Sequence, residues 1–112
     1  MRLEAKKLLY DVWEAATLVE SFVEKRSFDD YVRDPMLRSA IERQFEIMGE
    51  ALSRLAKVDP EVAAQVGDYR RIIAFRNVLI HGYDVVLNDV VWSIIEERLS
   101  PLVSTLKELL AG

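Results

Sequence analysis

Four side chains that can take part in acid–base or phosphate chemistry lie within the segment RNVLIHGY, residues 76–83. They are Arg76, Asn77, His81 and Tyr83. His81 is the one histidine of the 112-residue chain, and it is expected at the end of an apolar helix, directly before a glycine. An imidazole can exchange a proton near neutral pH, and the negative partial charge at a helix C-terminus favours its protonated form. A guanidinium can hold two phosphate oxygens at once.

Together, an imidazole and a guanidinium can cleave RNA without a metal ion. A base removes the proton of the 2′-hydroxyl, and positive charge stabilises the pentacoordinate phosphate. Arg70 and Arg71, one to two helical turns earlier, are candidates for contacts with RNA phosphates. A structural role is the alternative, because a histidine before a glycine is also a good C-terminal residue of a helix. Spacing alone favours this structural role.

The spacing of the two groups also has a geometric consequence. Asn77 and His81 are four residues apart and share a helix face, so the amide can orient the imidazole. Arg76 precedes His81 by five residues, which places it about 140° away around the helix axis. Either the long arginine side chain reaches around the helix, or a two-fold dimer joins two helix ends into one composite cleft.

The rest of the sequence predicts helices that would hold this segment. Apolar residues recur at spacings of three and four, and Ser, Asp and Pro residues provide helix start signals. Helices are expected at residues 6–25, 28–33, 35–57, 60–66, 69–81 and from residue 88 onward. Pro101 should kink or split the last helix near Ser100. No long stretch alternates with period two, so we predict one all-α domain over residues 1–112, an up-and-down bundle of four to five helices with a kinked last helix.

Two features of the segment 35–57 stand out. Charged residues follow one another at steps of four, and pairs such as Glu50 with Arg54 should stabilise a solvated or partner-facing surface. Gly49 lies in the middle of the same predicted helix. A mid-helix glycine costs roughly 1 kcal/mol relative to alanine, so its presence indicates that another backbone approaches closely there.

The amino-acid composition narrows the classes of function that the chain can have. The chain is 51% hydrophobic and 30% charged, has no cysteine and carries a net charge of −4. The absence of cysteine excludes a thiolate nucleophile and a cysteine zinc site, and we expect neither a metal nor a cofactor. The acidic balance argues against a general, charge-driven nucleic-acid binder. No segment predicts a membrane span or a signal peptide, so we expect a cytoplasmic protein without a membrane partner.

Three segments resemble the HEPN-domain family, and within it the HepT-like toxins of toxin–antitoxin pairs. The segment 76–83 resembles the family's Arg-x4-His-x-Tyr signature. The segment AIERQFEIMGEAL, residues 40–52, is similar to its arginine-containing helix with Gly-Glu-Ala, and VVWSIIEERLSPL, residues 90–102, is similar to its last helix. The sequence departs from the pattern at residues 67–70, where GDYR stands in place of a Pro-Trp-Arg-like run.

This resemblance implies an all-α bundle that forms a homodimer or a higher oligomer, with the motifs of two chains facing a shared cleft. It implies a metal-independent endoribonuclease that acts on RNA, in which Arg76 and His81 are catalytic and Asn77 is supportive. Tyr83 would accept AMP from a partner nucleotidyltransferase antitoxin of the MntA type. Each AMP would add negative charge and bulk beside the cleft and thereby exclude RNA.

Two other interpretations remain open at this stage. The chain could be a non-catalytic nucleotide-binding or partner subunit of a separate nucleotidyltransferase, in which the arginines grip a nucleotide phosphate. It could also be a helical dimerisation module without a site. For Tyr83 itself, the alternative role is that of a partly buried aromatic residue that covers the helix end.

Overall fold

The computed structural model describes residues 1–81 and 88–112. This part of the chain contains helices and no strand, as the sequence predicts. Its helices are α1 (Leu3–Val23), α2 (Phe28–Arg33), α3 (Pro35–Val58), α4 (Pro60–Gln65), α5 (Tyr69–His81) and α6 (Asn88–Ala111). Four of these six are long, and α2 and α4 have six residues each. None of them has the length and apolar character needed to cross a membrane.

Three of the predicted start signals are confirmed. Ser27 and Asp30 form a capping box at α2, with the Ser27 Oγ accepting from the Asp30 amide and the Asp30 carboxylate accepting from the Ser27 amide. Asp34 accepts hydrogen bonds from two amides in the first turn of α3, directly before Pro35. Asp59 caps α4, where it accepts from the amide of Val62 directly after Pro60 and Glu61. Capping satisfies amides that have no partner inside the helix, so these residues determine where the helices begin.

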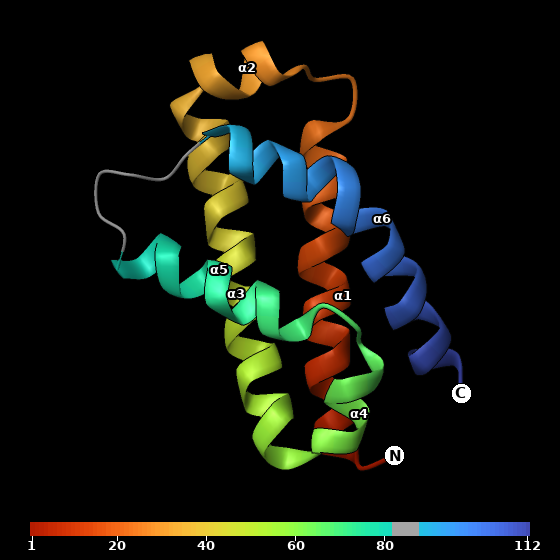
Figure 1. Cartoon of the computed structure of the whole chain (residues 1–112). Coiled ribbons are helices and arrows are strands. Elements are labelled where there is room, and N and C mark those ends of the chain that lie inside the picture. The colour runs from red at the N-terminus through yellow and green to blue at the C-terminus, as the bar shows by residue number, and fades with distance from the viewer. Residues whose placement is uncertain (82–87) are drawn as a thin grey trace.

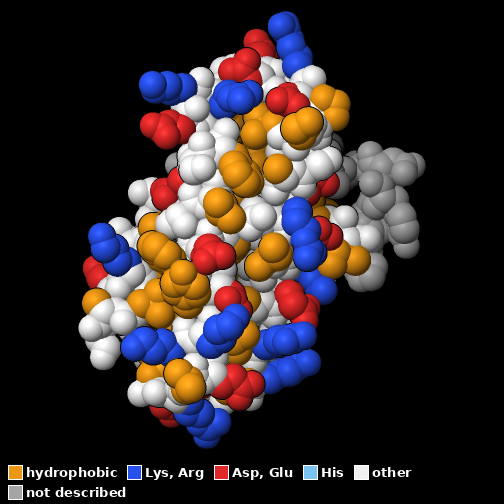
Figure 2. All heavy atoms as spheres, turned by 180° about the vertical axis from the view of Figure 1, so that it is seen from behind, with side chains coloured by type: hydrophobic (Ala, Val, Ile, Leu, Met, Phe, Trp, Pro, Cys, Tyr) orange, Lys and Arg blue, Asp and Glu red, His pale blue; other side chains and the backbone are white. Residues whose placement is uncertain are grey.

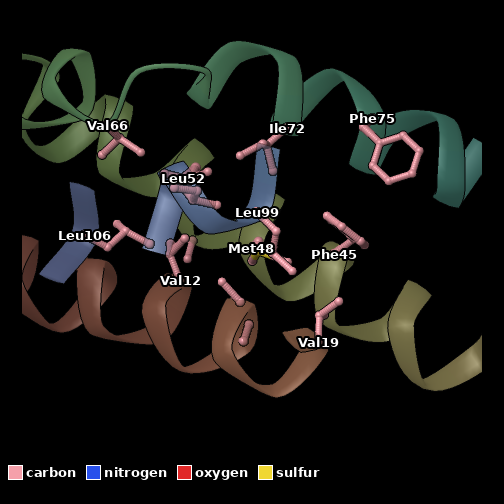
Figure 3. Packing of buried hydrophobic residues seen from close by; sticks show 14 of the residues in the cluster. Val12, Val19, Phe45, Met48, Leu52, Val66, Ile72, Phe75, Leu99 and Leu106 are labelled. Carbon is pink, nitrogen blue, oxygen red and sulfur yellow. The ribbon is translucent and has the colours of Figure 1, made fainter. Parts of the chain in front are cut away.

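The helices form a bundle around α1 and α3, which lie side by side (Figure 1). α5 crosses α3, whereas α6 packs against α1 and α2. Side chains from α1, α3, α5 and α6 meet in the core, as Figure 3 shows for Val12, Met48, Ile72 and Leu99. The packing of α5 on α3 therefore positions the segment that carries Arg76.

α6 bends partway along its length rather than splitting in two (Figure 1). Pro101 lies inside this helix, where it cannot donate to the carbonyl of Glu97. The bend agrees with the kink that the sequence predicts.

Candidate functional site: the cleft around Arg76

Arg76 lies where α5 packs on α3. One turn before the crossing Ile72 is buried, and the neighbouring Phe75 packs edge-on against Phe45 of α3 with 5.2 Å between the ring centroids (Figure 3). A Cβ atom at Gly49 would lie 2.3 Å from the Cβ of Arg76 and 2.6 Å from its Cγ. The close approach predicted at Gly49 is therefore confirmed, but the approaching group is a side-chain stem rather than a backbone.

The guanidinium of Arg76 is held from two sides. Its Nη2 donates to the Glu50 Oε2 at 3.1 Å, and its Nη1 donates to the Asn77 Oδ1 at 3.1 Å. Its Nε is buried and bonds no described residue. A guanidinium has five N–H groups, so each Nη retains an N–H that these two contacts do not use. The side chain is 27% exposed, so part of it reaches solvent.

Glu50 connects two arginines. Its Oε1 accepts from the Arg54 Nε at 3.1 Å, which confirms the predicted pair within α3. Its other oxygen binds Arg76, a contact that sequence reasoning missed because 26 residues separate the two. The available signal was Gly49, next to Glu50, which indicated that another element packs there.

A cleft of about 290 Å³ opens beside Arg76, between α1, α3 and α5. Its described charged side chains come in equal numbers of each sign. They are Arg43, Arg54 and Arg76, with Asp11, Glu46 and Glu50. The cleft within one chain is therefore close to neutral and lacks the strong positive field of a general nucleic-acid binder.

The face seen from behind in Figure 1 has a similar mixture of charges. Figure 2 shows basic and acidic side chains interspersed with hydrophobic ones over the described part of one face, without a large field of one sign. This pattern fits the net charge of −4. Recognition of an anionic ligand must therefore depend on local contacts rather than on long-range attraction.

The structure brings together some of the predicted site residues and separates others. Arg76 and Asn77 contact each other, whereas Arg70 and Arg71 lie at the start of α5 and do not line this cleft. Arg70 instead donates from Nε to the hydroxyl of Tyr69 at 3.0 Å.

The remaining predicted residues lie outside what the structure describes. His81 is the last residue of α5, but its side chain is not among the described ones. The predicted contact between Asn77 and His81 therefore lies outside the described residues, as does Tyr83. The described partner of Asn77 is Arg76.

Comparison with known proteins identifies the family. The profile of the family described as "Ribonuclease HepT-like" matches residues 12–109. A protein of Caldanaerobacter subterraneus named "Putative RNase" is 37% identical over 75% of this chain and 74% of its own length. A second protein of that description, from Methanocaldococcus jannaschii, is 31% identical over 84% of this chain and 85% of its own.

A third relative extends this similarity over nearly the whole chain. It is the "Probable ribonuclease HepT" of Thermococcus cleftensis, which is 29% identical over 97% of this chain and 98% of its own length. No solved structure matches the chain significantly. The sequence motif, the all-α fold and these matches agree, and the chain belongs to the HepT-like ribonuclease family.

Proposed function

We propose that this protein is a metal-independent endoribonuclease in which Arg76 and His81 carry out the reaction. The observation that supports this most directly is the placement of Arg76. The chain belongs to a ribonuclease family, and the guanidinium of Arg76 is held at the edge of a cleft. Its remaining N–H groups could bind a phosphate. Asn77 supports the reaction by holding Arg76 through its Oδ1.

In the proposed reaction, the neutral imidazole of His81 accepts the proton of a 2′-hydroxyl. The 2′-oxygen then bonds to phosphorus, and the bond from phosphorus to the 5′-oxygen breaks. A protonated imidazole returns the proton to the leaving 5′-oxygen. Arg76 stabilises the negative charge that develops on the phosphate oxygens. The products are a 2′,3′-cyclic phosphate and a 5′-hydroxyl.

The proposed active unit is a homodimer, or a higher oligomer that contains such dimers. Five residues of helix spacing would place Arg76 and His81 about 140° apart around the axis, so Arg76 of one protomer would act with His81 of its partner. The surface of α5 supports this arrangement. Val78 is 50% exposed, so an apolar side chain lies on α5 close to the site, where a second copy could cover it.

The proposed biological role is that of a toxin in a toxin–antitoxin pair. A nucleotidyltransferase antitoxin of the MntA type would neutralise it by transferring AMP to Tyr83, and the added phosphate would repel RNA. Intact mass spectrometry tests this step after incubation with the transferase and ATP. We expect the mass to rise by whole AMP units. An unchanged mass, or the same increase in Tyr83→Phe, would contradict it.

The test of the ribonuclease is cleavage of single-stranded RNA by purified protein in EDTA. We expect cleavage by the wild type and a loss of about 10²-fold or more in His81→Ala and in Arg76→Ala. Arg33→Ala is a matched control, because it removes an exposed arginine of α2. Cleavage that persists undiminished in both site variants would overturn the assignment.

The second candidate is a non-catalytic nucleotide-binding or partner subunit of a nucleotidyltransferase. The balance of charges in the cleft favours it, because a near-neutral cleft suits a small ligand better than a long polyanion. Tight nucleotide binding without any RNA cleavage by the unmodified protein would select this candidate.

A further inference from the structure

The arginines that share the cleft with Arg76 come from α3. Arg43 precedes Glu50 by seven residues and Arg54 follows it by four, and both line the cleft. Arg70 and Arg71 are closer to Arg76 in the sequence but do not line it. A strand of RNA bound at Arg76 would therefore find additional positive charge on α3, in the same cleft.

The two α3 arginines that line the cleft differ in how their charge is used. Arg54 is bonded to Glu50, the same carboxylate that binds Arg76, so a phosphate would have to compete for it. Arg43 is exposed and forms no ion pair with another described residue. A guanidinium without an internal counter-ion keeps its full capacity to bind a phosphate in a bidentate manner.

The arrangement along α3 fits a nucleotide chain. Ile47 lies one turn after Arg43 and faces the same cleft, where Leu8 of α1 and Ile80 of α5 complete an apolar wall. Seven residues of helix separate Arg43 from Glu50, a rise of about 10 Å. Phosphate binding at Arg43 would thus leave an apolar surface for a sugar or base before the strand reaches Arg76.

We infer that this cleft is a subsite for single-stranded RNA next to the cleaved bond, and that Arg43 binds a phosphate of that strand. The inference rests on the proposed ribonuclease function and adds the residue that holds the substrate. Because Arg43 touches a non-reacting phosphate, it contributes to substrate binding and not to the chemical step.

Steady-state cleavage of a single-stranded oligoribonucleotide at several salt concentrations tests this inference. In Arg43→Ala, we expect KM at low salt to rise about ten-fold while kcat stays unchanged. The slope of log KM against log salt should decrease by about 0.7, the value for one lost phosphate contact with a single strand. Arg43→Lys should keep the wild-type slope, because it keeps the charge. Arg33→Ala, the matched change away from the cleft, should behave as the wild type.

The outcomes separate this inference from the function on which it rests. If the wild type cleaves RNA and Arg43→Ala has the same KM and the same salt dependence, Arg43 is not a substrate contact. An equal rise of KM in Arg43→Ala and Arg33→Ala also overturns the inference, since it reflects total charge alone. A wild type that neither binds nor cleaves RNA would instead remove the proposed function itself.

Discussion

Glu50 on α3 and Arg76 on α5 form an ion pair with 3.1 Å between Oε2 and Nη2, although 26 residues separate them in the chain. The pair lies directly beside Gly49, where the stem of Arg76 packs on the surface of α3. The ion pair with Glu50 orients the guanidinium, and the packing on Gly49 sets the distance of Arg76 from α3. Together they determine where the charge of Arg76 stands in the cleft.

Replacing Glu50 tests whether this pair positions Arg76 for the reaction. Glu50→Gln keeps the size of the side chain but removes its charge, so the guanidinium loses its fixed orientation. We expect kcat for RNA cleavage to fall about ten-fold with little change in KM. Folding stability should change by less than about 1 kcal/mol, because the pair is partly exposed and screened by solvent.

Glu108→Gln on the exposed surface of α6 is the matched control and should leave both kinetic constants unchanged. A different result is also informative. If Glu50→Gln lowers KM and leaves kcat at the wild-type value, Glu50 competes with the substrate phosphate for Arg76 and does not position it.

Gly49→Ala should damage both the fold and the site. Alanine normally stabilises a helix by roughly 1 kcal/mol over glycine, but here the new Cβ would lie 2.3 Å from the Cβ of Arg76. Since both atoms are close to the backbone, α5 must shift away from α3. We expect a net loss of about 1 to 3 kcal/mol in the free energy of unfolding, measured with urea, and a matching loss of RNA cleavage.

Ser39→Ala, on the exposed side of α3, serves as the control for a small substitution in the same helix. It should change stability by no more than about 0.5 kcal/mol. A Gly49→Ala protein that is more stable than the wild type and fully active would show that α5 does not need this close approach.

The sequence predicts the helices well because their determinants are local. The capping residues Ser27, Asp34 and Asp59 each act on amides within three positions, and the apolar spacing that forms α3 repeats within one turn. The bend in α6 is equally local, because it follows from the missing amide of Pro101. Helix starts and the all-α class could therefore be read without any knowledge of tertiary contacts.

The candidate site could be predicted only in part because its contacts cross between helices. Arg76 and Asn77 were identified from their motif, but the contact with Glu50 depends on the angle at which α5 crosses α3. Arg70 and Arg71 stay predicted phosphate contacts, proposed for their proximity to Arg76 in the sequence. The packing of α5 on α3 also puts Arg43 of α3 in the cleft, which proximity in sequence does not show.

We expect Asn77 to position Arg76 through its side-chain oxygen and not through its NH₂ group. The Oδ1 accepts from the Arg76 Nη1 at 3.1 Å. Asn77→Ala removes this acceptor, and we expect kcat to fall about two- to ten-fold, the usual effect of one hydrogen bond. Asn77→Asp keeps an acceptor at the same place and should retain more of the wild-type kcat. If Asp is as harmful as Ala, Asn77 acts through its NH₂ group and the contact with Arg76 is not its main role.

Tyr31 gives a prediction about stability at alkaline pH. Its side chain is fully buried beside Trp92, with 5.6 Å between the ring centroids, and its hydroxyl has no partner among the described residues. Burial, with a further contribution from the negative charge of Glu42, raises the pKa of Tyr31 to about 12. The unfolded chain ionises Tyr31 near pH 10, before the folded protein does. The contribution of Tyr31 to the free energy of unfolding is therefore fully present below pH 10. It is lost as the pH rises from 10 to 12, by about 1.4 kcal/mol per pH unit.

Tyr31→Phe should remove this loss and also relieve the cost of the unpaired hydroxyl. Urea unfolding at pH 7 should show a gain of about 1 kcal/mol, since the variant buries the same ring without an unsatisfied polar group. The difference between variant and wild type should grow between pH 10 and pH 12, because phenylalanine cannot ionise. A variant that is less stable than the wild type at pH 7 would mean that the hydroxyl makes a favourable contact in the folded protein.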